Sequence, residues 1–476
     1  MLLRRLIALL SLVALLGCAG DGAITGRERA GTHLALVASQ GGLLQDAALQ
    51  AYVEGVTARV IEATPQRGSD WNVFVLDSPM INAFAQDGPL IYLTRGLIAL
   101  ANDEAELAAV IAHEIAHVEA DHNTALRRQR DAARRDLKRE FGRVAQSGGR
   151  LDSDRRAQLA DRARRSVAAF SREQEAEADV IGLTYLEAAG YDARAMADFL
   201  DAMIADGALA ARVAGRAFDP EARADRLATH PSGATRRRIV LSRIRDGGGE
   251  RGAARHLAAL DGMIWGEDGT DGFLLADAWV DPARGIAVPD FGAELFMQGD
   301  TVFVEPRGEA LTGFQAVGAV PGGPRAYLER DWADLIDRTR GAARLEWNDR
   351  PGYSSLTIRL PLGNKPDSPE LFVQVQARQV GREIVEFLTL AEAGDSAAIT
   401  LMQRMAQATR APTTAERRAA VPLRIALRPV RAGDRQQDIA AEMQVPDLAL
   451  ERLQALNNLD AGDALEPGDM LKILVR

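Results

Sequence analysis

His113-Glu114-Ile115-Ala116-His117 lies in a run of strong helix formers that begins near Asn102, the predicted N-cap residue. Residues four apart share one face of a helix, so both imidazoles can bind the same metal ion, as a tetrahedral zinc site requires. Glu114 is rotated by about 100° from His113, which leaves its carboxylate beside the metal. There it can take a proton from a zinc-activated water and return it to a leaving amine. The alternative is a pair of surface histidines, but this helix is apolar nearly all round, and buried polar groups need partners.

A second helix carries acids at a useful spacing. We expect this helix from about Ser153 to Ala189, with Gly190 just after its end. Glu175 and Asp179 are four residues apart and therefore share a face. One carboxylate can bind zinc while the other holds a histidine ligand through its second ring nitrogen. An acidic, solvated helix face is the alternative. Asp192 is the predicted N-cap of the next helix, which is expected to end near Gly207.

Two short β segments precede the histidine pair, at residues 72–76 and 90–94. The second lies directly upstream of the metal-binding helix, so we expect it to line the cleft. As an edge strand it could pair with an extended peptide; a purely structural hairpin is the alternative. After His117 the helix is expected to continue through a basic run. On such a helix His122 is rotated by about 140° from His117 and is interpreted as structural.

Bulk composition narrows the class of protein. The chain has 476 residues, an apolar fraction of 47%, and a formal net charge of -10. This length predicts two or three domains with ample core. The absence of a dominant basic surface argues against nucleic acid as a partner.

The N-terminus has the pattern of a processing signal. Arg4 and Arg5 precede an apolar segment, Leu6 to Leu16, that is too short to span a bilayer. Cys18 is the one cysteine of the chain and follows Leu15-Leu16-Gly17, which resembles a bacterial lipobox. We therefore expect a lipoprotein that is cleaved before Cys18 and anchored to a membrane by acylation of that residue. An ordinary secretory signal with an incidental cysteine is the alternative.

Several motifs together resemble the BepA-type periplasmic zinc proteases, which are soluble relatives of the CAAX prenyl-protease. The similarity covers roughly residues 45–245 and rests on Ile81-Asn82-Ala83-Phe84, Glu104-Ala105-Glu106-Leu107-Ala108, His113-Glu114-Ile115-Ala116-His117, Ser171-Arg172-Glu173-Gln174-Glu175-Ala176-Glu177-Ala178-Asp179, and Gly182. The resemblance implies a mostly helical, gluzincin-like fold with a small sheet. It also implies that Glu175 is the third zinc ligand and that Asp179 is the acid behind the ligands.

Thr229-His230-Pro231 is similar to a His-Pro segment of the same family. The resemblance implies that His230 lies near the metal, where it occupies the fourth position at rest or stabilises the oxyanion. A histidine in a surface loop is the alternative. One residue of Arg236–Arg238 could fix this loop or contact the site, and the sequence does not decide which.

The sequence also predicts where the domains begin and end. The predicted boundaries are a signal peptide at 1–18, a tether at 19–43, a metalloprotease domain at 44–250, an α+β accessory domain at 251–421 and a LysM-like domain at 422–476. The last segment resembles a LysM module in its strand-helix-helix-strand pattern. Arg435 stands where that family usually has threonine, so glycan binding, a docking role and a purely structural role all stay open.

These observations predict an α+β multidomain protein that binds one Zn²⁺ per chain and hydrolyses peptide bonds in protein substrates. The resemblance implies misfolded or misassembled envelope proteins as substrates. With Ala19 after the cysteine, it also favours the periplasmic face of the outer membrane. The rival hypothesis is an assembly or chaperone-like protein, or a peptidoglycan-associated one, whose protease site is gated or vestigial.

Overall fold

The computed structural model divides into two units, which are described separately. It describes residues 33–34, 36–38, 40–86, 89–146, 153–213, 215, 217–218, 233–244, 248–298, 300–305, 310–339, 341, 343–361, 370–392 and 395–476. The helical unit comprises residues 42–266 and 423–476, and the sheet unit comprises residues 267–422 together with the described residues of 33–41. The predicted signal peptide, Cys18 and His230 lie outside the described residues. Within those residues, no helix combines the length and apolar character that a bilayer-spanning segment needs.

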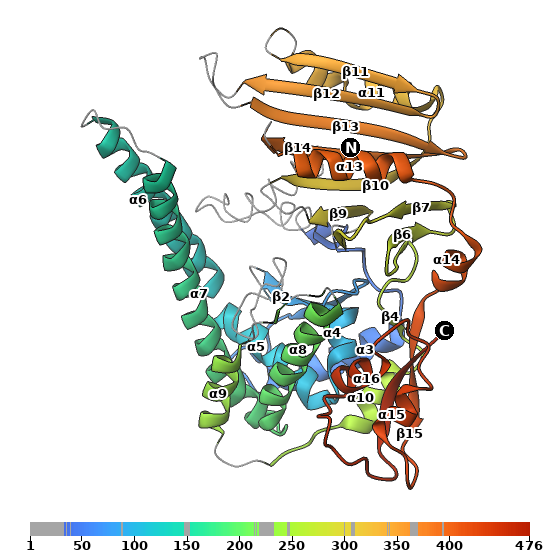
Figure 1. The fold of residues 1–476 in the computed structure, drawn as a ribbon. Helices are drawn as coiled ribbons and strands as arrows, with labels where there is room; N and C mark the ends of the chain where they lie inside the picture. The colour runs from blue at the N-terminus through green and yellow to red at the C-terminus, as the bar shows by residue number, and fades with distance from the viewer. Residues whose placement is uncertain are drawn as a thin grey trace. The chain divides into compact units, whose positions relative to one another are not determined.

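A buried central helix organises the helical unit (Figure 1). Its helices are α3 (Ala47–Glu62), α4 (Arg95–Leu100), α5 (Glu104–Glu119), α6 (His122–Gln146), α7 (Ser153–Ala188), α8 (Arg194–Val213), α9 (Ala234–Arg243) and α10 (Ala253–Leu260). Helix α5 is buried from Glu104 to His117 and packs against α3, α7, α8 and the small sheet. It begins after Asp103, whose carboxylate accepts a hydrogen bond from the Glu106 amide at 2.9 Å. The prediction of Asn102 as N-cap is therefore wrong by one residue.

The small sheet has three strands, β1 (Asn72–Leu76), β2 (Ala83–Gln86) and β3 (Leu90–Thr94). Its order is β1-β3-β2, with β3 parallel to β1 and antiparallel to β2. Strand β3 is thus central, and the prediction that residues 90–94 could act as an edge strand is wrong. Its side chains Ile91 to Thr94 are buried, as expected for a strand covered on both faces. The edge is β2.

Two helix boundaries also differ from the prediction. Helix α5 ends at Glu119, and Asp121 has a positive φ of 53° before α6 begins at His122. The expected continuous helix is therefore broken there. Helix α8 was expected to end near Gly207, but it continues to Val213 because a single glycine only weakens a helix. Helix α7 ends close to its predicted position, and Gly190 follows it with a φ of 79°.

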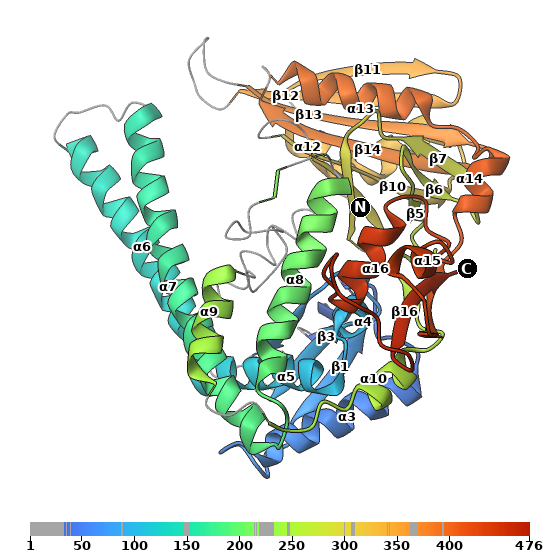
Figure 2. The ribbon, with the colours of Figure 1, turned by 60° about the horizontal axis from the view of Figure 1, so that its bottom comes forward.

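The C-terminal segment is built into the helical unit. Its elements are β15 (Leu423–Pro429), α15 (Gln436–Ala440), α16 (Ala449–Asn457) and β16 (Met470–Val475), in the predicted strand-helix-helix-strand order. Strand β15 lies between β16 and the short strand β4 (Ile264–Trp265), and α16 packs against α8 (Figure 2). The fully buried Lys472 ammonium donates to the carbonyl oxygens of Ala99, Leu100 and Ala101 at 2.9, 3.1 and 2.8 Å. The domain boundaries and the LysM assignment stay predictions.

The sheet unit consists of antiparallel sheets with helices, which agrees with the predicted α+β class. A seven-stranded sheet has the order β11-β12-β13-β14-β10-β9-β8. The strands of the unit are β5 (Phe273–Leu274), β6 (Ala278–Asp281), β7 (Ile286–Pro289), β8 (Glu294–Gln298), β9 (Thr301–Glu305), β10 (Leu311–Ala319), β11 (Arg344–Arg350), β12 (Tyr353–Pro361), β13 (Glu370–Val380) and β14 (Glu383–Glu392). Its helices are α11 (Gly323–Asp331), α12 (Ala333–Thr339), α13 (Ser396–Ala408) and α14 (Thr414–Ala419). The buried Glu386 accepts hydrogen bonds from Tyr327 and Trp332, so this carboxylate is part of the core.

Candidate metal centre

Three buried side chains from two helices converge on one point. His113 and His117 of α5 bring their Nε2 atoms to within 3.0 Å of each other. Glu175 of α7 places one carboxylate oxygen 3.5 Å from Nε2 of His113 and the other 3.6 Å from Nε2 of His117. Two nitrogens bound at 2.0–2.1 Å to tetrahedral zinc stand about 3.3 Å apart. The donor set and its spacing therefore fit a zinc ion.

Close packing of α7 on α5 brings the acids to the histidines. At Gly182 a Cβ atom would lie 3.0 Å from the backbone nitrogen of His113 and 3.1 Å from the carbonyl carbon of Ala112. The missing side chain thus lets the two backbones approach. Asp179 lies about one turn and Glu175 about two turns before this contact, on the same side of α7.

Asp179 lies behind the histidine pair. Its carboxylate is 3.0 Å from Nδ1 of His113 and accepts two hydrogen bonds from Arg236 of α9, at 2.8 and 2.7 Å. Burial would raise the pKa of Asp179, but Arg236 and His113 hold it well below its usual range. An ionised Asp179 keeps Nδ1 of His113 engaged and leaves Nε2 for the metal.

Of the three residues Arg236–Arg238, Arg236 is the one that contacts the site, which the sequence alone did not decide. Its guanidinium is buried and also lies 3.1 Å from the Glu175 carboxylate. Arg238 instead donates to Thr235 within its own helix. Burial alone would lower the pKa of His113, but its contacts with Asp179 and Glu175 raise it to about 9. A metal ion must displace that proton, so binding at this centre releases acid.

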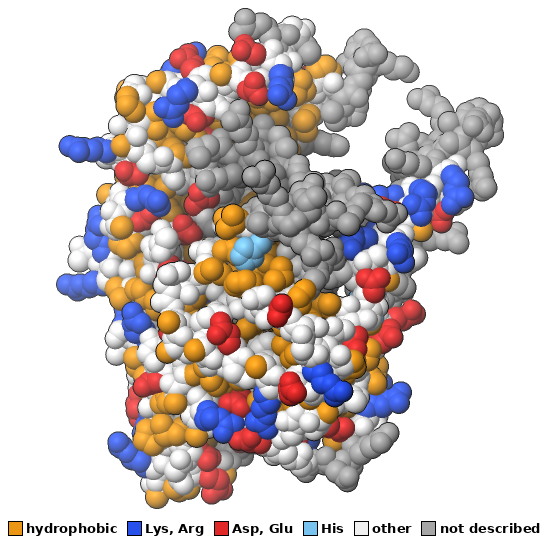
Figure 3. Space-filling model, turned by 180° about the vertical axis from the view of Figure 1, so that it is seen from behind, with side chains coloured by type: hydrophobic (Ala, Val, Ile, Leu, Met, Phe, Trp, Pro, Cys, Tyr) orange, Lys and Arg blue, Asp and Glu red, His pale blue; other side chains and the backbone are white. Residues whose placement is uncertain are grey.

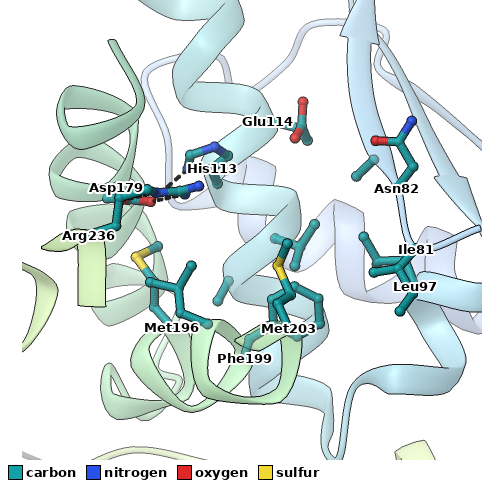
Figure 4. Close-up of a pocket in the computed structure, with 14 residues that line it drawn as sticks. Ile81, Asn82, Leu97, His113, Glu114, Asp179, Met196, Phe199, Met203 and Arg236 are labelled. Atoms are coloured by element: carbon teal, nitrogen blue, oxygen red, sulfur yellow. Dashed lines mark hydrogen bonds and ion pairs between the residues drawn. The ribbon is translucent and has the colours of Figure 1, made fainter. Parts of the chain in front are cut away.

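Glu114 lies beside the ligands instead of among them. It follows His113 on α5 and is buried. In Figure 4 it lies on the side of α5 that faces Asn82, away from Asp179 and Arg236. Glu114 and His113 nevertheless line the same pocket. This is the position that proton transfer next to a metal requires.

The pocket that opens beside Glu114 is mainly apolar. Its empty volume is about 540 Å³, which includes open solvent, and its apolar lining includes Leu97, Val110, Met196, Phe199, Leu200 and Met203. Four of these belong to α8 at positions i, i+3, i+4 and i+7, the spacing of one helix face. That periodicity was the sequence signal that could have identified them. In the space-filling view from behind, a histidine side chain lies among hydrophobic side chains (Figure 3).

His122 is closer to the centre than the sequence predicted. The interpretation as a residue rotated away from His117 is wrong, because the two Nδ1 atoms are 3.0 Å apart. The predicted catalytic residue His230 lies outside the described residues, so its role stays a prediction. Among the described residues, His113, His117 and Glu175 form the one group of histidine and acidic side chains whose geometry suits a metal ion.

Comparisons with known proteins agree with this geometry. Residues 45–244 match Peptidase family M48. The chain is 28% identical over 165 residues to the beta-barrel assembly-enhancing protease of Escherichia coli K12, covering 34% of each chain. It is 31% identical over 165 residues to a putative beta-barrel assembly-enhancing protease of Vibrio cholerae, covering 33% of each. It is 30% identical over 153 residues to the mitochondrial metalloendopeptidase OMA1 of Schizosaccharomyces pombe, covering 30% of this chain and 41% of that protein. The matched region thus spans about a third of the bacterial relatives.

Proposed function

We propose that the chain is a zinc-dependent endopeptidase, on the premise that residues 45–244 match Peptidase family M48. The observation that carries the proposal is the buried group of His113, His117 and Glu175 with the Glu114 carboxylate beside it. A structural zinc site is closed by four protein ligands, whereas a catalytic site keeps one position open for substrate. Three protein donors next to a pocket match the catalytic type.

Each side chain of the centre has a distinct task in peptide hydrolysis. Zinc held by His113, His117 and Glu175 would polarise the scissile carbonyl and activate the attacking water. Glu114 accepts the proton of that water and delivers it to the departing amine. Asp179 orients His113 through its Nδ1 atom, and Arg236 fixes Asp179 and Glu175.

The pocket and the edge strand favour an extended peptide as substrate. Strand β2 is paired on one side only among the described strands, and Ala83 at its start lines the pocket together with Ile81 and Asn82. An extended substrate segment could add to this edge by main-chain hydrogen bonds. A bulky apolar side chain of the substrate would then enter between Phe199 and Val110. Native proteins bury such side chains, so unfolded or misassembled proteins are the substrates that fit.

The setting of the reaction is the cell envelope. The lipobox-like segment ending at Cys18 supports attachment to a membrane on its periplasmic face. The names of the bacterial relatives connect them with β-barrel assembly, and we extend this to misassembled envelope proteins as substrates of the present chain. Peptidoglycan is a further candidate partner, through residues 422–476.

The test compares cleavage of an unfolded protein, such as casein, by wild type, Glu114→Gln and chelator-treated protein. We expect Glu114→Gln to retain zinc and to lose cleavage by about 10²- to 10⁴-fold, the range that general acid-base catalysis contributes. Glu173→Gln, an exposed change on α7, is the matched control and should cleave like wild type. Cleavage that survives Glu114→Gln would exclude this mechanism.

The same two proteins, wild type and Glu114→Gln, also separate the rival functions. A wild type that cleaves nothing, while Glu114→Gln preserves its role in the cell, would favour an assembly or chaperone-like protein. Sedimentation with purified cell-wall sacculi, measured on wild type and Glu114→Gln, would reveal a peptidoglycan-associated protein whether or not it cleaves substrates.

A further inference from the structure

A break between two helices brings a third histidine to the centre. Helix α5 ends two residues after His117, and Asp121 takes a left-handed backbone conformation with a φ of 53°. Aspartate tolerates this conformation better than most residues because its short side chain can hydrogen-bond locally. The chain therefore turns, and His122 at the start of α6 lies alongside His117, with ring centroids 4.8 Å apart.

His122 is held from three directions. Its Nδ1 atom lies 3.0 Å from Nδ1 of His117, and its Nε2 atom lies 3.3 Å from a carboxylate oxygen of Glu177. Its backbone carbonyl accepts a hydrogen bond from the side chain of Gln174 at 3.0 Å. His122 is 4% exposed, whereas the Glu177 side chain is 62% exposed. A buried imidazole thus connects His117 with a carboxylate at the surface.

The direction of these hydrogen bonds follows from the metal. A neutral imidazole that offers Nε2 to zinc carries its proton on Nδ1. His117 must then donate from Nδ1, so Nδ1 of His122 is the acceptor. His122 in turn carries its proton on Nε2 and donates it to Glu177. All three groups are satisfied in this one arrangement, and the other tautomer of His117 would place a proton where the metal binds.

We propose that His122 and Glu177 form a positioning pair that fixes the orientation and tautomer of His117 for zinc. The two histidine ligands are then supported differently. His113 is held directly by the buried Asp179, whereas His117 is held through the imidazole of His122, which in turn contacts an exposed acid. Neither member of the pair touches the metal or the substrate. The pair acts through His117, as residues behind metal ligands do in other zinc sites.

The first experiment measures zinc affinity by competition with a chromophoric chelator, together with urea unfolding of the zinc-free protein. His122→Leu removes the acceptor, and we expect zinc to bind about ten- to a hundredfold more weakly. His122→Asn places an amide oxygen near the position of Nδ1 and should recover part of the loss. A purely structural His122 would behave differently: the zinc-free variants would unfold more easily, and the folded fraction would bind zinc as wild type does. That result would overturn the proposal.

The second experiment uses the exposed member, whose replacement does not disturb the core. Glu177→Ala should weaken zinc binding and accelerate zinc release, by less than His122→Leu does. Glu173→Ala is the matched control, because Glu173 is an exposed glutamate one turn earlier on the same helix. Equal zinc affinity and release in both alanine variants and wild type would contradict a role for Glu177.

The pair depends on the proposed zinc site, but its test does not depend on proteolysis. A wild type that binds zinc tightly and cleaves nothing would refute the endopeptidase while the ranking of the His122 variants still decides the pair. A wild type that binds no zinc would refute both.

Discussion

At the scale of single residues, the charges around the metal position balance when a divalent ion is present. Glu175, Asp179 and Glu114 supply three buried carboxylates, and Arg236 supplies one cation whose side chain is only 12% exposed. With Zn²⁺ the formal charges of these groups cancel, which lowers the cost of burying them. Arg236 thus allows the third ligand and the residue behind His113 to be acidic together.

A buried histidine outside the metal centre, His256, predicts sensitivity to acid. His256 lies 3.0 Å from the Tyr52 hydroxyl through Nδ1 and 3.0 Å from the carbonyl oxygen of Ala101 through Nε2. Burial, with the nearby Lys472 ammonium, lowers the pKa of His256 to about 3. The unfolded chain therefore takes up a proton near pH 6.5 that the folded chain excludes until about pH 3. Its contribution to stability is complete above pH 6.5 and is lost as the pH falls, by up to about 1.4 kcal/mol per pH unit.

The check is urea unfolding of wild type and His256→Gln at pH 7 and pH 5. Glutamine can still donate to Ala101 but does not titrate. Between these two pH values, wild type should lose about 2 kcal/mol more unfolding free energy than the variant. Equal losses would show that His256 is not the group that titrates.

At the scale of elements, the contact between α5 and α7 sets the distance between the histidines and the acids. Gly182→Ala adds a Cβ 3.0 Å from the His113 backbone nitrogen, so α7 must move by a few tenths of an ångström. We expect a net loss of up to about 2 kcal/mol of stability, because overpacking costs about 1–3 kcal/mol and alanine regains about 1 kcal/mol of helix propensity. Zinc affinity should fall with it, because Glu175 moves with the helix.

Gly55→Ala in α3 is the matched control, because its added Cβ meets nothing within 4 Å. That variant should be as stable as wild type or slightly more stable, and it should bind zinc equally well. Chelator competition and urea unfolding of both variants measure the two effects. A Gly182→Ala protein with wild-type zinc affinity would show that the close approach is not needed for the metal.

The elements also show what the sequence could predict. The pairs His113–His117 and Glu175–Asp179 could be predicted because residues four apart share a face of a continuous helix, whereas the choice of Glu175 as the third ligand came from the family resemblance. His122 was missed because the helix breaks at Asp121, a residue that gives no strong stop signal. The central position of β3 was missed because strand order depends on pairing between distant segments, which periodicity along the chain does not encode. The pocket face of α8 was overlooked although its spacing was visible.

At the scale of the whole molecule, residues 267–422 of the sheet unit are inserted between two parts of the helical unit. Residues 267–422 enter after β4 and return at β15, and these two strands pair with each other, Trp265 opposite Leu423. The two ends of the insertion are therefore adjacent in space, as is common for inserted domains. Residues 423–476 complete the helical unit, since Lys472 binds the carbonyl oxygens of Ala99 to Ala101 just before α5.

This topology predicts opposite results for two deletions. Replacing residues 267–422 by a short Gly- and Ser-containing turn should give a protein that unfolds cooperatively and binds zinc like the full chain, since β4 and β15 can close as a hairpin.

Deleting 423–476 should abolish folding, because it uncovers a set of core side chains that includes Ile425, Leu453, Leu456, Ile473 and Leu474. Burial of each of these side chains stabilises the fold by about 1.5–3 kcal/mol. Their sum is comparable to the total unfolding free energy of a typical domain, about 5–15 kcal/mol. Circular dichroism melting and zinc titration of both proteins measure the outcome. A stable, zinc-binding chain that lacks 423–476 would mean that the C-terminal segment is an independent module, and its loss could then be used to test cell-wall binding alone.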